Sequence, residues 1–441
     1  MFYIVEQESK LENLQRLSKL GLYVEVISSN DYYHPKLTST VAVYIRPLKS
    51  KRGFIVPVNH DEGLNVSKER ISQLLLSCKE IYTYDKKELL YHFNIQSAID
   101  VSLLYSMTEY DRLDVKDDIP TINYYYSRYS NFKNINQFVP LSKLFEKYEK
   151  KYESIEKYID IEIPDNFEFY NNTATNVFFL LEQAGLGIYY DAFNKMFNPK
   201  DPNYSIINNT VLTSYNLYNV TSRPTNAFNS VNFAAIPKGR DFRSCFHPKG
   251  DVFLELDFDG YHLRLLCEQI DYTLSDESAH KQLAKQYFEK EEITDDEYNE
   301  AKQINFQAIY GKIPEKFAFL EVFEKIDGFI KGLWSEYKAN GRILAPISNK
   351  PFTKKLKDMH PQKLMNYVMQ SLETSRNILI IKEVLRYLKD KKTKLVLYTY
   401  DALLFDFYKE DGEETLDKLK EILESGGKYP TKLKYSKDLS L

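Results

Sequence analysis

The stretch DVFLELDFDGYHLRLLCEQI, residues 251–270, joins a strand pattern to a helix pattern. Residues 252–256 form an apolar run typical of a buried strand, Gly260 interrupts it, and residues 262–270 have helical spacing. Asp257 is therefore expected where a strand gives way to a helix, a place where a carboxylate can face an open cleft. A strand-end aspartate on its own is more often a turn or cap residue, so its meaning depends on the rest of the chain.

A second strand-centred stretch, KLVLYTYDALLFDFY, occupies residues 394–408. Two β-rich runs flank Asp401 and Ala402, which predicts a hairpin with Asp401 at its tip. Asp-Ala is a poor two-residue turn compared with Asp-Gly, and this indicates that the carboxylate is there for another reason. Two carboxylates at the tips of separate strands can share two Mg²⁺ ions, as in-line phosphoryl transfer requires.

Between these stretches lies AKQINFQAIYG, residues 301–311. Lys302, Phe306 and Tyr310 are spaced i, i+4 and i+8, so on a helix they form one stripe. An ammonium group in line with two rings suits a nucleoside triphosphate, with the cation on phosphate and the rings against base and sugar. A packed helix face with a snorkelling lysine has the same pattern.

Taken together and in this order, DFDGYHLR, AKQINFQAIYGK and TYDALLFDF resemble motifs A, B and C of the family A, DNA polymerase I-like enzymes. TSRPTNAFNSVNFAAIP with RDFRSCF, HKQLAKQYF and NYVMQS resemble further family stretches in the same order. The resemblance covers about residues 172–441. It implies a template-directed DNA polymerase of a compact phage or plasmid type.

The resemblance also implies roles for individual residues. Asp257 and Asp401 would be the catalytic carboxylates that bind two Mg²⁺ ions, and Lys302 the triphosphate ligand and general acid. The nucleotide pocket would be built by His262, His280, Phe306 and Tyr310. The residues expected to contact DNA are Arg223, Asn232, Arg264, Asn366 and Gln370. The implied partners are primer–template DNA, dNTPs and a processivity factor or other replisome protein.

Three positions depart from the family pattern. Tyr298 stands where motif B has an Arg four residues before its Lys, so one phosphate contact is missing or supplied elsewhere. His262 replaces the Glu that excludes ribose, which puts discrimination against ribonucleotides in question. Motif C, usually His-Asp-Glu, reads Tyr400-Asp401-Ala402 and lacks one carboxylate.

The expected fold is α+β, a right-hand polymerase with palm, fingers and reduced thumb, preceded by a small α/β ribonuclease H-like domain. We expect a degenerate exonuclease-like domain at 1–120, a solvated helical connector at 121–165, a reduced thumb at 166–220, and palm and fingers at 221–441, with the fingers at about 273–350. A good helix is expected from residue 172 to Gly185. The stretch between Asp191 and Arg223 is too short for the family's long thumb hairpin, which predicts low processivity.

The N-terminal domain resembles the family's 3′–5′ exonuclease more weakly. Tyr23 stands where the first metal-binding Asp belongs, and Ile81 where an Asn is usual, while Glu25 and Asp85 are retained. Only two of the four metal-binding carboxylates of the exonuclease pattern are retained, and two carboxylates do not hold two metal ions tightly. We therefore expect no proofreading.

Composition sets wider limits. The 441 residues carry 59 Lys and Arg against 63 Asp and Glu, a net charge of −4, which argues against a histone-like surface but allows a local basic cleft. The three cysteines have no zinc spacing, and no signal peptide or 18-residue apolar run is visible, so a cytoplasmic protein without membrane contact is expected. If the chain is phage-encoded, this is the host cytoplasm.

Two other functions remain open from the sequence. A single-subunit RNA polymerase or primase-like enzyme would account for His262. A non-catalytic DNA-binding remnant would account for Tyr298 and Ala402, although the survival of Asp257, Lys302 and Asp401 together disfavours it.

Overall fold

The computed structural model describes residues 3–17, 21–115, 118–129, 132–197, 205–226, 231–237 and 239–441. The chain divides into two compact units. The first unit comprises Met1–Gln183, Phe197–Tyr218 and Asn226–Val231, and the second comprises Ala184–Met196, Asn219–Thr225 and Asn232–Leu441. Each unit is described by itself.

A five-stranded mixed sheet forms the centre of the first unit. Its strands are β1 (Leu22–Ser28), β2 (Thr40–Pro47), β3 (Phe54–Pro57), β4 (Ile81–Thr83) and β5 (Ile99–Asp100), in the order β3-β2-β1-β4-β5. β1 pairs antiparallel with β2 and parallel with β4, and β4 pairs parallel with β5. The mixed sheet with intervening helices agrees with the α/β pattern expected for this part of the chain.

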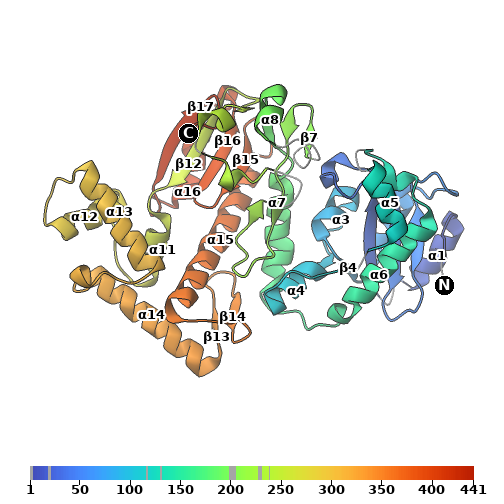
Figure 1. The fold of residues 1–441 in the computed structure, drawn as a ribbon, viewed down its shortest axis with the longest axis horizontal. Helices are drawn as coiled ribbons and strands as arrows, with labels where there is room; N and C mark the ends of the chain where they lie inside the picture. Colours follow the sequence, from blue (N-terminus) through green and yellow to red (C-terminus); the bar gives the residue numbers. More distant parts are fainter. Residues whose placement is uncertain are drawn as a thin grey trace. The chain divides into compact units, whose positions relative to one another are not determined.

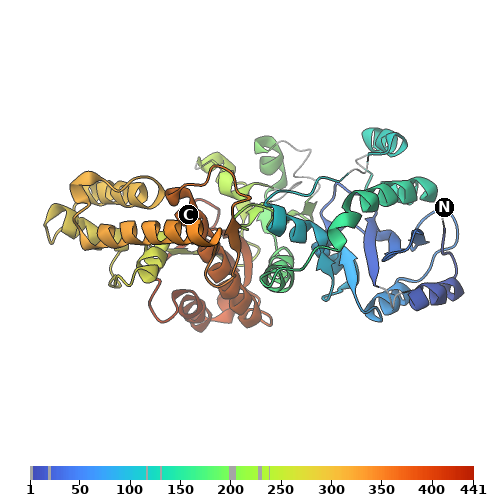
Figure 2. The same cartoon turned by 90° about the horizontal axis from the view of Figure 1, so that it is seen from below.

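Helices cover both faces of this sheet (Figure 2). α1 (Glu8–Leu17), α2 (Lys68–Leu76) and α3 (Lys86–Phe93) pack on one face, and α5 (Pro120–Tyr129) and α6 (Leu141–Ile159) on the other, with α4 (Val101–Glu109) beside α6. β1 shows why two faces are buried: Val24 and Val26 pack toward α1–α3, whereas Tyr23 and Ile27 pack toward α5 and α6.

The helix α6 corrects the prediction of a solvated connector at 121–165. Its apolar residues recur every three or four positions and are buried in the core of the first unit: Leu144, Tyr148, Tyr152, Ile155 and Ile159. The Lys and Glu residues between them disguised this stripe in the sequence. The segment therefore belongs to the first unit, where Lys147 and Lys151 of α6 form ion pairs with Asp31 and Glu25.

In the second unit, a four-stranded antiparallel sheet has the order β15-β16-β12-β17 (Figure 1). The strands are β12 (Val252–Phe258), β15 (Lys394–Thr399), β16 (Ala402–Phe407) and β17 (Thr431–Ser436). α15 (Pro361–Tyr387) and α16 (Glu413–Glu424) pack against this sheet and each other, and α11 (Tyr261–Gln269) packs on α15. These elements occupy the segment predicted as palm, and the sheet is called the palm sheet below.

Three further helices extend from the palm beyond α11 (Figure 1). They are α12 (Ala279–Phe288), α13 (Asp295–Tyr310) and α14 (Glu321–Asn340), followed by the hairpin of β13 (Arg342–Leu344) and β14 (Pro351–Thr353). Thr294 and Glu297 form a capping box at the start of α13, which fixes where the helix begins. These elements occupy the segment predicted as fingers.

The segment 166–220 does not form a separate reduced thumb, because the two units share it. The π-helical turn Phe169–Ala174 and α7 (Thr175–Leu181) belong to the first unit. The strand β6 (Leu186–Ile188) and α8 (Tyr190–Met196) belong to the second, where β6 pairs with β11 (Phe246–His247). The helix predicted to end at Gly185 ends at Leu181.

Short elements complete the two units: Pro35–Leu37, Ile135–Gln137, β7 (Ile206–Ile207), β8 (Thr210–Val211), β9 (Tyr215–Asn216), β10 (Thr225–Asn226), Phe233–Ala235, α10 (Arg240–Arg243), Glu315–Phe317 and Lys409–Asp411. In the described ranges, none of the helices combines the length and the apolar character needed to span a bilayer.

Candidate active site

Two carboxylates meet at one end of the palm sheet. β12 pairs with β16 so that Asp257 is opposite Ala402, and the Phe258 amide donates to the Asp401 carbonyl at 2.9 Å. Tyr400 has a positive φ of 63° and turns the chain between β15 and β16, which places Asp401 in the predicted hairpin turn. Both the strand end at Asp257 and the hairpin follow the sequence prediction.

The two carboxylates raise each other's electrostatic energy. Desolvation, with the charges of Asp257 and Glu373, raises the pKa of the Asp401 carboxyl to about 6. Lys434 of β17 partly balances this charge, since its ammonium lies 3.4 Å from Asp257 and 2.9 Å from Glu255. A site of this kind favours cations.

The stripe on α13 faces outward. Lys302 is exposed, and Phe306 and Tyr310 are 43% and 41% exposed. The buried face is formed by Ala301, Ile304, Asn305, Ala308 and Ile309. In the described part of the chain Lys302 forms no ion pair, and its Nζ lies 5.9 Å from the centre of the Phe306 ring. The stripe is therefore not a packed helix face, and its ammonium is available to a ligand.

A cavity of about 180 Å³ brings these elements together. Eight of the residues predicted for the site line it: Arg223, Asp257, His262, His280, Lys302, Phe306, Tyr310 and Asp401. It is also lined by Asp259, Tyr298, Glu373 and Lys432, of which the sequence had singled out Tyr298 alone.

His262 belongs to a charged network that spans the cavity. Its Nε2 lies 2.7 Å from a carboxylate oxygen of Glu373, and its Nδ1 bonds to the Tyr310 hydroxyl. Glu373 also accepts from Arg223 at 3.2 Å, and the Arg223 guanidinium lies 3.8 Å from the centre of the Tyr400 ring. Burial would raise the pKa of Glu373, which is 1% exposed, but His262 and Arg223 lower it, so Glu373 is ionised.

His280 is held as a neutral donor. The Tyr287 hydroxyl donates to the Asn305 side-chain oxygen, which turns the Asn305 amide nitrogen toward His280 Nδ1 at 2.9 Å. The proton of the neutral ring is then on Nε2. Burial lowers the pKa of His280 to about 4. Gly260, with φ 60°, lies beside this ring, and a Cβ there would approach Ala279 to 2.9 Å.

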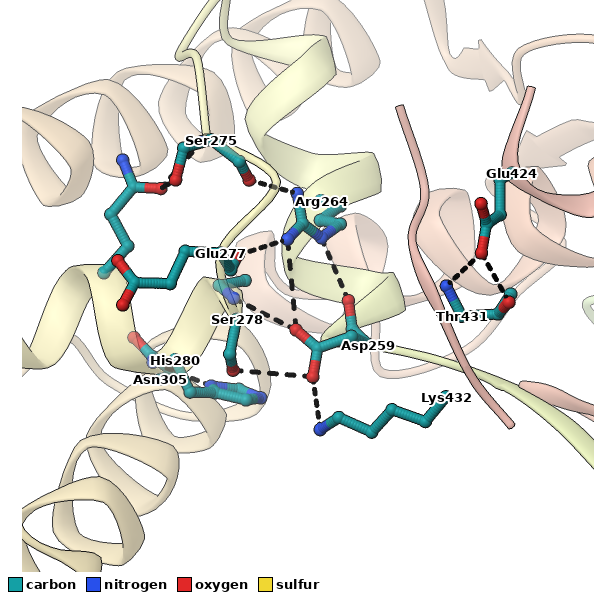
Figure 3. A network of polar contacts seen from close by, with 12 residues as sticks. Asp259, Arg264, Ser275, Glu277, Ser278, His280, Asn305, Glu424, Thr431 and Lys432 are labelled. Atoms are coloured by element: carbon teal, nitrogen blue, oxygen red, sulfur yellow. Dashed lines mark hydrogen bonds and ion pairs between the residues drawn. The ribbon is translucent and has the colours of Figure 1, made fainter. Parts of the chain in front are cut away.

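Arg264 corrects a prediction. It was expected to contact DNA, but it is 6% exposed and donates to three backbone carbonyls, those of Asp259, Ser275 and Glu277, at 2.7–3.0 Å (Figure 3). Its donors are engaged inside the protein, so its role is to tie α11 to the loop before α12.

Of the other predicted DNA contacts, Arg223 lines the cavity, whereas Asn232, Asn366 and Gln370 do not. Asn232 is exposed, and Asn366 and Gln370 are half-buried on α15. Asn366 and Gln370 share one stripe with Glu373 and Asn377, at i, i+4, i+7 and i+11. Asn377 bonds to the Tyr261 and Tyr398 hydroxyls and the Tyr400 carbonyl. This polar spacing was the signal that could have identified Glu373 and Asn377.

The exonuclease-like residues of the first unit are engaged with protein groups. Tyr23 is fully buried and its hydroxyl donates to Glu25, which also pairs with Lys151 at 3.1 Å. Burial raises the pKa of Glu25, and the Lys151 ammonium opposes that shift. Asp85 caps α3 by accepting from the Glu88 amide.

The palm sheet, the three helices beyond it and the cavity between them define a class of fold, the α+β fold of a DNA polymerase domain. No family model matches the sequence, and no curated protein does. Among solved structures, the chain is similar to the POL domain of Pol1 from M. smegmatis, determined in complex with DNA primer-template and dNTP. The TM-score is 0.71 at 11% identity, over 100% of this chain and 99% of that one.

Proposed function

We propose that the protein is a DNA-dependent DNA polymerase that adds dNMPs to a primer 3′-hydroxyl by two-metal phosphoryl transfer. One observation carries the proposal: Asp257, Asp401 and the exposed Lys302 come from distant segments and line one cavity in a chain with a polymerase fold. The solved relative was captured with primer-template and dNTP, which supports the same partners here.

The carboxylates fit magnesium. Among the described residues no cluster of three or more His, Cys, Asp or Glu ligands occurs. The two carboxylates of Asp257 and Asp401 would therefore be the protein ligands of the ions. That donor set suits Mg²⁺, which commonly binds through one or two carboxylates and completes its shell with water and substrate phosphates. When bound, the metal supplies a lowered pKa for the attacking hydroxyl and stabilisation of the leaving pyrophosphate.

The remaining side chains position the nucleotide. Lys302 binds the triphosphate and donates the proton that the departing pyrophosphate needs, and His280 donates its Nε2–H to a phosphate oxygen. Phe306 and Tyr310 stack against base and sugar. His262, fixed by Glu373, closes the pocket beside the sugar.

Primer extension with Mg²⁺, comparing dNTPs with rNTPs on a DNA template, tests the proposal. Template-directed extension with dNTPs is the expected result. Equal use of rNTPs would favour the RNA polymerase alternative, and duplex binding without any extension would favour a DNA-binding remnant.

Synthesis is expected to be distributive. Among the described residues of 184–218 the helix α8 has seven residues, far from a long hairpin that grips duplex phosphates. The net charge of −4 leaves little general attraction for DNA, so dissociation should increase with salt. Product lengths on a labelled primer–template, measured with excess unlabelled DNA as a trap, should be a few nucleotides per binding event. Long products under the trap would contradict this.

No proofreading is expected from the first unit. Glu25 is already satisfied by Tyr23 and Lys151, and Asp85 by a helix end, so these carboxylates are poorly placed to share two metal ions. A 3′-labelled mismatched primer incubated with Mg²⁺ and no dNTP should stay intact. Label release that disappears in a Glu25→Gln variant would overturn the expectation.

A further inference from the structure

Besides Lys302 and Arg223, a third cationic side chain, Lys432 of β17, lines the candidate active site. β17 pairs antiparallel with β12, and Lys432 stands opposite Asp257 in the register. Directly paired residues of antiparallel strands point to the same face of a sheet. The Lys432 side chain is 54% exposed and lines the same cavity as Lys302.

Lys432 forms an ion pair with Asp259, and Asp259 has further partners besides it (Figure 3). The Asp259 carboxylate, 6% exposed, also accepts from the Ala279 amide at 3.1 Å and the Ser278 hydroxyl at 3.4 Å, and lies 3.9 Å from Arg264. The positive end of α12 adds to this compensation. When the exposed Lys432 ammonium turns toward a ligand, Asp259 keeps its hydrogen bonds from Ala279 and Ser278 and the nearby charge of Arg264.

Tyr298 places an uncharged side chain in the cavity at the position where the motif B pattern has an Arg. Tyr298 lies one turn before Lys302 on α13 and lines the cavity without a charge. The Lys432 ammonium is close enough to interact electrostatically with Tyr298 and with His280. The Lys302 ammonium also interacts electrostatically with His280. Lys432 and Lys302 thus act on the same part of the cavity.

We propose that Lys432 is a second triphosphate-binding cation that takes the place left neutral by Tyr298. A nucleoside triphosphate carries several negative charges, and charge-assisted contacts to phosphate are among the stronger hydrogen bonds in proteins. The inference rests on the proposed function, and it names a residue for the phosphate contact that motif B lacks.

Equilibrium binding of a Mg²⁺–dNTP to the full chain on a dideoxy-terminated primer–template tests the assignment without turnover. Lys432→Met keeps the aliphatic stem and removes the charge, and should weaken dNTP binding about 10-fold, the effect of losing one charged hydrogen bond. Lys432→Arg should restore most of the affinity. Lys428→Met, on the exposed lysine paired with Glu268, should leave it unchanged. Pyrophosphate binding should weaken in parallel, because the contact is to phosphate.

The outcomes separate the two proposals. Equal dNTP affinity in wild type and Lys432→Met would overturn the Lys432 assignment and leave the polymerase proposal standing. A wild-type chain that binds primer–template but no dNTP would overturn both. Weakened primer–template binding in Lys432→Met, with unchanged pyrophosphate affinity, would also overturn the assignment, since it would place Lys432 on DNA.

Discussion

Replacing Asp401 by asparagine is expected to lower the rate of single-nucleotide incorporation by roughly 10³-fold. Charge stabilisation by a bound metal contributes several kcal/mol to such a transfer, and each 1.36 kcal/mol is a factor of ten in rate. Asparagine keeps the shape of the hairpin turn but removes one of the two carboxylates on which the proposed metal site would depend. The loss should therefore appear in kcat at saturating Mg²⁺ and dNTP.

The same change should not destabilise the fold. Desolvation, Asp257 and Glu373 raise the pKa of Asp401 to about 6, so the ionised carboxylate, which predominates above that pH, costs the folded chain stability relative to the unfolded one. A neutral Asn relieves this repulsion, and the melting temperature without Mg²⁺ should stay level or rise. Asp417→Asn, on the exposed face of α16, makes the same charge change away from the cavity and should keep wild-type activity. Wild-type rates in Asp401→Asn would exclude the proposed metal role.

Glu373→Gln is expected to change nucleotide selection as well as rate. The substitution keeps the side-chain shape but removes the charge that holds His262 at 2.7 Å and Arg223 at 3.2 Å. Losing one partner of a buried ion pair is strongly destabilising, commonly by about 3 kcal/mol or more, and the partly exposed Arg223 moderates that loss here. With His262 released, catalytic efficiency should fall about 10-fold or more with dNTPs, and less with rNTPs.

Separate kcat and KM values for a dNTP and the matching rNTP check this prediction. Glu383→Gln is the control, because Glu383 lies on the same helix and pairs with Arg386 at its exposed end. His262→Ala provides the second comparison. If His262→Ala shifts the dNTP-to-rNTP ratio and Glu373→Gln does not, Glu373 has no part in positioning the ring.

Local sequence patterns were enough for the elements that carry the predicted chemistry. The strand ending near Asp257, the hairpin at Asp401 and the helix bearing Lys302 each follow from periodicity and turn residues within about 20 positions. Their agreement with the structure reflects a short-range cause: strand and helix periods are set by the backbone itself.

The partners of individual side chains could be identified only from the tertiary structure. The sequence predicts an accessible cation at Arg264, but in the structure its guanidinium donates hydrogen bonds to backbone carbonyls of the loop before α12. The helix α6 was predicted to be solvated because its many Lys residues obscure the apolar stripe in the sequence. Two of those Lys residues form ion pairs with carboxylates of the first unit. The apolar stripe of α6 is present in its own sequence, but the carboxylates that pair with its Lys residues, Asp31 and Glu25, lie more than 100 positions away.

The sequence by itself determined the fold class and brought the chemistry of Asp257, Asp401 and Lys302 into view, because each is part of a local pattern. Only the tertiary structure decided that Glu373 would anchor His262 and that Lys432 would stand beside Asp257. Those placements depend on the packing of α11 on α15 and on the register between β12 and β17, and both are set by buried surfaces formed between residues far apart in the chain.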